Sequence, residues 1–526
     1  MQTQRLATSK PKPPRTLEEL KLMLPEHIHD LFLRSCTEIT LEQAERVAYF
    51  LLEFETVFAK NDTDLGCYTD ITHSIDTSDA KPVRLQMRRT PLGFQGEEEK
   101  HLRQMLDMGV IRESTSEWAA APVLVRKRDG SVRYCIDYRD LNNVTVKDAF
   151  PLPKIQECLD TLGNNAFLST LDLQSGYWQL LVDPKDVHKT AFITKYGLFE
   201  HVRLPFGLCN SPATFSRAMQ LLLRGLSWRT VLSYLDDVVI LGTSFENHLD
   251  NLREVLVRLQ QNNLKLKPKK CSLFKTEIDF LGRKVSKHGI SVHPNHIDKV
   301  KTWPTPKNVN DIEKFLGFVN YHRDFIKDYA EYTTPLLKLT HKGVPFEWTE
   351  EHHQSFERLK QLLISTPSLG FPDENLTFIL DTDASLTAIG CELSQIDANG
   401  KTRVISYGSY VLTPAQRNYC ATKRELLAVV KFTRQYRHYL LGKPFYVRTD
   451  HNSLTWLTRF KNIQGMLARW LEELSQYDMT IVHRAGKEHV NADALSRIPD
   501  PINVCNCYQA GKKTRRFTLF SKWPNL

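Results

Sequence analysis

Three aspartates of the sequence could share one metal-dependent site. Asp236 and Asp237 lie between two apolar, β-branched half-strands in VLSYLDDVVIL, and Asp172 ends a third apolar run, FLSTLD. A surface hairpin tip would also accommodate such a pair, because Asp tolerates turn conformations. The flanking residues are nevertheless apolar enough to be buried, and buried carboxylates need a compensating cation. If the two strands are neighbours in one sheet, Asp172 can face Asp236, and the carboxylates can hold two divalent cations for phosphoryl transfer.

A second set of carboxylates follows in the C-terminal half of the chain. Asp381 and Asp383 share one face of the strand LTFILDTD, because they are two residues apart. Glu425 precedes the apolar run of a helix, Asp450 ends the strand FYVRTD, and Asp493 lies in NADALSR at a helix start. Each carboxylate alone is compatible with a structural or solvated role, and a helix dipole favours Asp493. As a set they form a strand-Asp, helix-Glu, strand-Asp and late-Asp pattern.

The elements that must position these residues follow from periodicity and turn signals. VLVRKRDGSVRYCIDY predicts a hairpin around Asp129-Gly130. Three- and four-residue spacing of apolar residues predicts helices, and alternation predicts strands. We expect strands at 167–173, 189–193 and 198–204, a hairpin at 230–241, helices at 41–58, 211–223 and 245–262, three strands from 376, a helix over 414–441 and a strand at 445–449. The sequence therefore predicts two α/β regions, 86–290 and 371–500, joined by a helical segment.

The charge is unevenly distributed along the chain. Of the 526 residues, 70 are Lys or Arg and 61 are Asp or Glu, which gives +9. Residues 251–300 carry 11 basic and 4 acidic side chains, or +7, and residues 401–450 carry 10 and 2, or +8. Residues 351–400 carry 2 and 8, or −6. Basic clusters are usually solvated surfaces, but several in one large chain favour a track for nucleic-acid phosphates.

The composition excludes other classes of protein. The 10 cysteines lack a repeated spacing, which argues against a disulfide scaffold and for a reducing compartment. The longest apolar stretch, Val231 to Leu241, contains two aspartates, so we expect no transmembrane segment. The N-terminus lacks the apolar stretch of a signal peptide. We therefore expect a cytoplasmic protein.

Both sets of motifs resemble those of one known family. The segments LDLQSGYWQL, LPFGLCNSPATFSRAM and YLDD, with IDYRDLN and FLGRKVS, resemble the reverse transcriptase of gypsy-type (metavirus) LTR retrotransposon Pol polyproteins over residues 120–290. The second carboxylate pattern resembles the ribonuclease H that follows it, over residues 375–497. The resemblance implies an α+β fold: a right-hand polymerase of fingers, palm and thumb, followed by a ribonuclease H-like α/β domain.

The resemblance also implies a division into domains. We expect an N-terminal extension with a helical segment at 1–85, fingers and palm at 86–290, thumb and connection at 291–370, a ribonuclease H-like domain at 371–500 and a disordered basic tail at 501–526. Neither a protease signature in the first 90 residues nor a zinc module after Arg497 is found. We therefore expect the polymerase and nuclease portion of Pol.

The family's polymerase residues can be carried over one by one. The resemblance gives Asp172, Asp236 and Asp237 as catalytic metal ligands. Tyr177 matches the aromatic residue that excludes a ribose 2′-OH, and ordinary core packing is its alternative. Substrate contacts are assigned to Lys127 and Arg133 (triphosphate), to Phe206 and Gly207 (nucleotide), and to Leu281 and Gly282 (primer grip). Phe206 stands where retroviral enzymes have Gln, and Lys127 and Arg133 can also be read as solvated hairpin charges.

For the nuclease, the resemblance gives Asp383, Glu425, Asp450 and Asp493 as catalytic metal ligands. Asp383 is preferred to Asp381, because the family's aspartate precedes two small residues, here Ala384 and Ser385. His483 occupies the place of a loop histidine that could move protons or assist product release. An exposed loop histidine is the alternative.

The sequence thus predicts an RNA- and DNA-directed DNA polymerase with ribonuclease H activity, using two Mg²⁺ ions per site, or Mn²⁺ in their place. Its partners would be RNA template, DNA primer, RNA/DNA hybrid and dNTPs, with no membrane. A monomer and a dimer are both compatible, in the cytoplasm or in virus-like particles. The rival hypotheses are a catalytically inactive nucleic-acid-binding relic and a host adaptor derived from the element.

Overall fold

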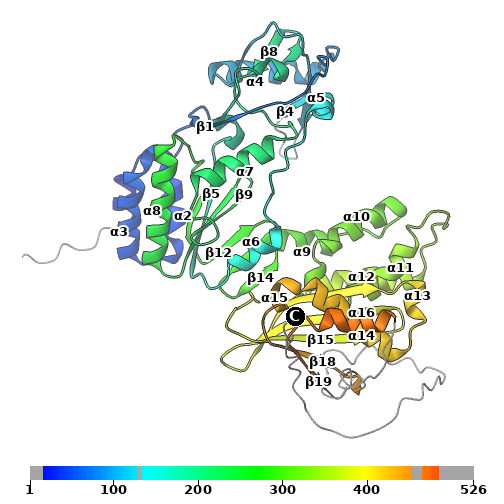
Figure 1. Ribbon diagram of the computed structural model, residues 1–526. Coiled ribbons are helices and arrows are strands. Elements are labelled where there is room, and N and C mark those ends of the chain that lie inside the picture. The colour runs from blue at the N-terminus through cyan, green and yellow to red at the C-terminus, as the bar shows by residue number, and fades with distance from the viewer. Residues whose placement is uncertain (1–15, 127–129, 131, 453, 455–464, 485–526) are drawn as a thin grey trace, which may run out of the picture. The chain divides into compact units, whose positions relative to one another are not determined.

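The computed structural model describes residues 16–126, 130, 132–452, 454 and 465–484 of the chain. These residues form a mixture of helices and strands (Figure 1). The chain divides into two compact units, Met1–Ile278 and Asp279–Leu526, and each is described by itself. No helix within the described residues combines the length and the apolar character that a membrane crossing requires.

Helices of the first unit begin at recognisable caps. The hydroxyls of Thr16 and Thr40 accept from the third backbone amide of α1 and α3, and the side chains of Glu19 and Gln43 accept from the cap amides in return. The helices of this unit are α1 (Leu17–Leu22), α2 (His29–Ser35), α3 (Leu41–Glu53), α4 (Gln95–Asp107), α5 (Arg139–Val144), α6 (Ile155–Thr161), α7 (Ser211–Leu222) and α8 (Phe245–Gln261).

A four-stranded sheet in the order β11-β5-β10-β9 forms the centre of the first unit. Smaller sheets are β1-β6, β2-β8-β7 and β3-β4. The strands are β1 (Tyr68–His73), β2 (Ile111–Glu113), β3 (Ala121–Arg126), β4 (Val132–Asp137), β5 (Phe167–Asp172), β6 (Leu180–Val182), β7 (Phe192–Thr194), β8 (Gly197–His201), β9 (Val231–Tyr234), β10 (Asp237–Gly242) and β11 (Ser272–Lys275).

The apolar core of the first unit is continuous from the N-terminal helices to the central sheet. Phe50 and Phe54 of the N-terminal region belong to the same buried cluster as Leu252 of α8 and Val238 of β10. Figure 1 shows α8 beside α2 and α3. The N-terminal region is therefore an integral layer of this unit, because burial of apolar side chains is the main favourable term in folding.

The second unit begins with a small antiparallel sheet and a set of helices. Its strands are β12 (Glu277–Phe280), which starts at the boundary, β13 (Arg283–Ser286) and β14 (Gly289–Val292). The helices that follow are α9 (Pro294–Lys301), α10 (Val309–Asn320), α11 (Tyr329–Lys338) and α12 (Glu350–Ile364). They correspond to the helical segment that the sequence predicts between two α/β regions.

A five-stranded sheet in the order β17-β16-β15-β18-β19 completes the second unit. Its strands are β15 (Phe378–Ala384), β16 (Ala388–Ile396), β17 (Thr402–Val411), β18 (Phe445–Thr449) and β19 (Met479–His483). The helices are α13 (Pro414–Arg417), α14 (Ala421–Gln435), α15 (Arg437–Leu440) and α16 (Met466–Leu474). The prediction of one helix over 414–441 is wrong: Cys420 adopts an extended conformation (φ −63°, ψ 159°) and starts a new helix.

Candidate active sites

The first cluster of carboxylates lies at the end of the central sheet. Strands β5 and β10 are antiparallel neighbours, as predicted, and Asp172 is the direct register partner of Asp237. Asp236 lies in the two-residue turn that joins β9 to β10, where Leu235 has a φ of +52°. The facing residue is therefore Asp237 and not Asp236, because the turn takes Asp236 out of the ladder.

The electrostatics of this cluster favour a bound cation. Desolvation raises the pKa of Asp236, and the charges of Asp172 and Asp237 raise it further. The pKa of Asp237 is raised by desolvation and by Asp172. Lys270 supplies one compensating charge, since its Nζ lies 3.0 Å from Asp172 Oδ2. Three carboxylates against one ammonium form an oxygen-rich set that fits hard divalent cations.

Tyr177 lies next to these carboxylates in an aromatic cluster. Its ring is 5.0 Å from that of Phe206 and 5.2 Å from that of Phe215, centroid to centroid. Desolvation and the charge of Asp236 raise the pKa of Tyr177 to about 12, so the phenol stays neutral. Phe206 remains 43% exposed and presents an apolar surface. Gly207 follows with a φ of +99°, a conformation that favours glycine.

The two residues assigned to the triphosphate belong to the β3-β4 hairpin. Arg133 lies on β4 opposite Val125 of β3, and its side chain is exposed. This hairpin forms its own two-stranded sheet, apart from the sheet of Asp172. Lys127 lies outside the described residues. An exposed arginine at this position is free to contact an anion and equally to be solvated.

Leu281 and Gly282 form the turn between β12 and β13 in the second unit. Both have positive φ, +47° and +71°, which is the pattern of a type I′ hairpin turn. The Tyr321 hydroxyl donates a hydrogen bond to the Leu281 carbonyl. A Cβ on Gly282 would lie 3.2 Å from that hydroxyl oxygen, so Gly282 allows the close approach of Tyr321.

A second cluster of carboxylates lies at the end of the five-stranded sheet. Asp383 is near the end of β15, Asp450 directly follows β18, and Glu425 lies on α14. One carboxylate oxygen from each of the three lies within 4.8 Å of the others. Strands β15 and β18 are parallel neighbours, so their carboxyl ends deliver the two aspartates to the same edge.

Burial and mutual repulsion disfavour the ionised form of these carboxylates when no cation is bound. Desolvation, followed by the charge of Asp450, raises the pKa of Asp383 to about 6. Desolvation, with the charges of Asp383 and Asp450, raises the pKa of Glu425 to about 9. Glu425 Oε2 is buried without a hydrogen-bond partner among the described residues. An orphaned buried oxygen within a group of three carboxylates fits a divalent metal ligand set.

The structure distinguishes Asp381 from Asp383 by their partners. Arg448 is the register partner of Asp381 across β15 and β18, and its guanidinium binds both carboxylate oxygens. Asp381 is thereby compensated by an arginine, while Asp383 faces two other carboxylates.

His483 Nε2 lies 2.9 Å from the Asp450 carbonyl oxygen. Asp493 lies outside the described residues.

Sequence reasoning missed two cationic partners, Lys270 of Asp172 and Arg448 of Asp381. Lys270 belongs to the basic run KLKPKK, whose position within the +7 block is the one signal that could have drawn attention to it. Arg448 lies on β18, two residues before Asp450, and only the register with β15 shows which aspartate it pairs with.

Comparisons with known proteins match the two stretches of the chain that contain these clusters. Residues 125–285 match the family described as reverse transcriptase (RNA-dependent DNA polymerase), and residues 373–477 match the RNase H-like domain found in reverse transcriptase. The chain is 38% identical over 463 residues to the retrovirus-related Pol polyprotein from transposon 297 of Drosophila melanogaster, covering 87% of this chain and 43% of that protein. It is 35% identical over 425 residues to the transposon Tf2-3 polyprotein of Schizosaccharomyces pombe, covering 79% and 32%. The chain therefore spans less than half the length of these relatives.

The fold is also similar to that of solved structures. Foamy viral protease-reverse transcriptase in complex with double-stranded DNA matches with a TM-score of 0.80 at 22% identity, covering 94% of this chain and 85% of that one. The foamy viral enzyme in complex with an RNA/DNA hybrid matches with a TM-score of 0.73 at 21% identity, covering 97% and 67%. Together with the two family matches, these similarities confirm the predicted α+β fold, a right-hand polymerase followed by a ribonuclease H-like domain.

Proposed function

The chain belongs to the family of gypsy-type retrotransposon Pol polyproteins and carries their reverse transcriptase and ribonuclease H domains, and we propose that it is an active enzyme with both activities. It would copy an RNA template from a DNA primer with dNTPs, and it would degrade the RNA strand of the resulting hybrid. The observation that supports this most directly is that Asp383, Glu425 and Asp450 bring carboxylate oxygens within 4.8 Å of one another. At the other site, Asp172 faces Asp237 across two strands, and the charges of both aspartates act on Asp236.

At the polymerase site, the three aspartates would hold two Mg²⁺ ions, with Mn²⁺ as an alternative. When bound, the two ions would stabilise the attacking and leaving oxygens of an in-line displacement. Tyr177 would support the sugar of the incoming nucleotide and exclude a 2′-OH, because its neutral ring is fixed between Phe206 and Phe215. Lys127 and Arg133 would bind the triphosphate through charge-assisted hydrogen bonds. Leu281 and Gly282 would contact the primer.

At the nuclease site, Asp383, Glu425, Asp450 and Asp493 would hold the same kind of ion pair. The raised pKa values mean that, without a cation, Glu425 would keep its proton at neutral pH and Asp383 would keep its proton below about pH 6; metal binding would release these protons. His483, whose ring lies against the Asp450 carbonyl, would assist proton movement or product release. The basic blocks at 251–300 and 401–450 would bind the backbone of the hybrid, so affinity should fall with salt.

The experiment that tests this function uses the purified chain with two substrates. We expect extension of a DNA primer on an RNA template and cleavage of the RNA strand of a hybrid, both dependent on Mg²⁺ and abolished by EDTA. A chain that binds the hybrid but carries out neither reaction would instead be an inactive nucleic-acid-binding relic. As proposed, the enzyme acts in the cytoplasm or in virus-like particles, as a monomer or a dimer.

A further inference from the structure

The strand end that carries Asp172 extends beyond its partner in the central sheet. Strand β11 pairs with β5 at Thr170 and Leu168, two and four residues before Asp172. Beyond β11, the segment 264–267 takes over the pairing. The Lys267 amide donates to the Asp172 carbonyl at 2.8 Å, and Leu266 forms an antiparallel bridge with Leu173. The backbone of Asp172 is therefore held on this side by a short non-strand segment.

That segment has a second partner, which comes from the N-terminal extension. Phe58 and Leu266 form a parallel bridge. The Leu266 amide donates to the Val57 carbonyl, and the Ala59 amide donates to the Leu266 carbonyl, both at 2.8 Å. Since Leu266 is buried, its backbone groups would be costly to leave unpaired. Residues 57–59, 264–267 and 172–174 thus form three adjacent strips, with the N-terminal strip outermost.

Two glutamines fasten these strips to one another. Gln179 is fully buried, and its Nε2 donates to the carbonyls of Gln174 and Lys265, both at 2.8 Å. Its Oε1 accepts from the Lys265 amide at 2.7 Å. Gln174 is 3% exposed, and its Nε2 donates to the Asp62 carbonyl at 3.0 Å. A buried amide with all these partners rigidifies its surroundings, because losing any of them leaves a polar group unsatisfied.

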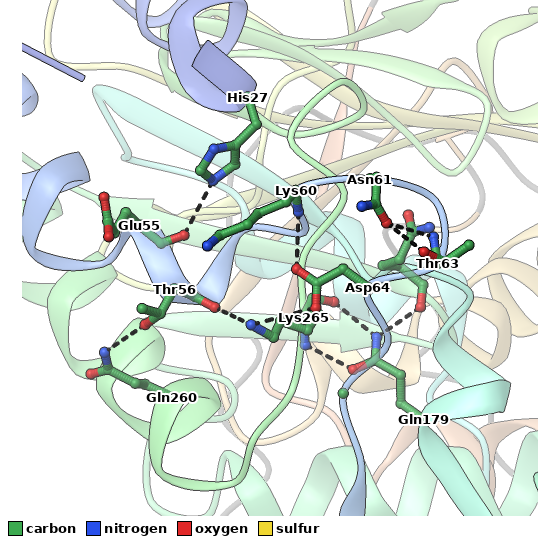
Figure 2. A network of polar contacts seen from close by, with 12 residues as sticks. His27, Glu55, Thr56, Lys60, Asn61, Thr63, Asp64, Gln179, Gln260 and Lys265 are labelled. Atoms are coloured by element: carbon green, nitrogen blue, oxygen red, sulfur yellow. Dashed lines mark hydrogen bonds and ion pairs between the residues drawn. The ribbon is translucent and has the colours of Figure 1, made fainter. Parts of the chain in front are cut away.

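The N-terminal loop is itself fixed by a polar network (Figure 2). Lys265 Nζ donates to the Thr56 carbonyl at 2.5 Å and lies 3.8 Å from Asp64. The Lys60 amide donates to Asp64 Oδ2 at 3.0 Å. Asp62 also pairs with Lys267, whose Nζ lies 2.8 Å from its Oδ1. The loop therefore contacts both residues that flank Leu266, the centre of the middle strip.

We propose that the N-terminal segment 55–67 is a positioning element of the polymerase site, which acts on Asp172 through Gln174 and Gln179. The inference rests on the proposed polymerase function and adds to it a requirement outside the palm motifs. Gln174 and Gln179 are positioning residues, since neither is placed against substrate. The carboxylates of the nuclease site belong to the other unit, so we expect hybrid cleavage not to depend on this segment.

The test compares Gln179→Met and Gln174→Met with the matched control Gln260→Met. Gln260 contacts the same N-terminal segment, through Thr56 Oγ1 at 3.0 Å, but from α8. Gln174→Met keeps the backbone bonds and loses only the contact with Asp62, so it is the milder change if Gln179→Met fails to fold. Thermal unfolding and hybrid cleavage of each full chain serve as folding controls.

Two quantities are measured for each variant. The first is the rate of primer extension as a function of Mg²⁺ concentration. The second is binding of Mn²⁺ alone, measured by electron paramagnetic resonance in chains that also carry Asp450→Asn to weaken the nuclease site. For both positioning variants we expect at least about a tenfold rise in the Kd for Mn²⁺ and in the half-saturating Mg²⁺ concentration, the scale of losses on removing outer-shell support. Gln260→Met should retain wild-type values.

Each result bears on the proposal. Wild-type metal dependence and Mn²⁺ affinity in both variants would overturn it, and so would a loss of extension with unchanged Mn²⁺ affinity, since that indicates a general structural defect. An equal loss in Gln260→Met would overturn the route through the two glutamines. A wild-type chain that does not extend primers, but whose Mn²⁺ affinity falls in the two variants, would refute the proposed polymerase function while supporting the positioning of Asp172.

Discussion

Asp172 and Asp237 are direct register partners, at the end of the ladder where β5 ends and β10 begins. Their side chains lie on the same face of the sheet, because directly opposed residues of an antiparallel pair point to the same side. Two like charges opposite one another are unfavourable, and the ion pair between Lys270 and Asp172 compensates only part of that charge. The sheet thus positions two carboxylates before any ligand binds.

The separation of Asp381 from Asp383 leads to a paired prediction for the nuclease. Asp383→Asn should lower hybrid cleavage at least about 100-fold, because a direct ligand matters no less than its outer-shell support. Asp381→Asn should keep cleavage within a few-fold of wild type. It should instead destabilise the second unit by about 1–3 kcal/mol, since Arg448 loses its ionised partner. Cleavage rates and thermal unfolding separate the two effects, and equal losses of cleavage would contradict the assignment.

Metal-free stability should depend on pH through Glu425. Its pKa is about 9 in the folded chain, above the ordinary value of 4.5, so the folded state retains a proton that the unfolded state loses. The stability that the folded state gains from retaining this proton is fully present below about pH 4.5 and is lost as the pH rises through 9. Asp383 acts in the same direction, with its loss complete above about pH 6. In EDTA, the Tm of the second unit should therefore fall between pH 5 and pH 9.

Glu425→Gln should remove most of that dependence. At pH 8 in EDTA we expect the variant to be more stable than wild type by at least about 1 kcal/mol, or a Tm higher by about 2–4 °C. Added Mg²⁺ should raise the Tm of wild type more than that of the variant, because a ligand of the folded state stabilises it. Glu374→Gln, at an exposed glutamate, is the matched control. Identical pH profiles of wild type and Glu425→Gln would contradict the cause assigned here.

Gly66 lies where the N-terminal segment packs tightly against Asn263 and Gln179. A Cβ there would lie 2.1 Å from the Asn263 carbonyl oxygen and 2.4 Å from Gln179 Oε1. Gly66→Ala should therefore force a backbone shift and destabilise the first unit by about 1–3 kcal/mol. Gly96→Ala in α4, where nothing lies within 4 Å of the added carbon, should be neutral or stabilising by up to about 1 kcal/mol. Denaturant unfolding of the two variants checks this, and equal stabilities would contradict the close contact.

Local sequence predicted the elements with strong periodicity and clear turns. The hairpin at 230–241 appears as β9 and β10, and the amphipathic helix at 245–262 appears as α8 (Phe245–Gln261). Over 414–441, apolar spacing continues through the break at Cys420, so periodicity alone could not reveal that three helices replace one. A pattern of side chains reports the buried face, and it is insensitive to a short interruption in the backbone.

Contacts between segments that are distant in the sequence could not be predicted from local sequence patterns. The pairing of 57–59 with Leu266 joins residues more than 200 positions apart, and no turn or periodicity encodes it. Sequence could not tell Asp236 from Asp237 as the partner of Asp172 either, because a shift of one residue in the turn exchanges their positions. The roles of all the site residues stay predictions, and Asp493 and Lys127 also lie outside the described residues.

The central claim is that one chain holds two separate catalytic sites, and a reciprocal measurement tests it most directly. Primer extension and hybrid cleavage are measured in parallel on wild type, Asp236→Asn and Asp450→Asn, with Tm values to verify folding. We predict that Asp236→Asn loses extension by at least about 100-fold and retains cleavage, and that Asp450→Asn shows the reverse. Loss of both activities in either folded variant, or retention of both in both variants, would contradict the account.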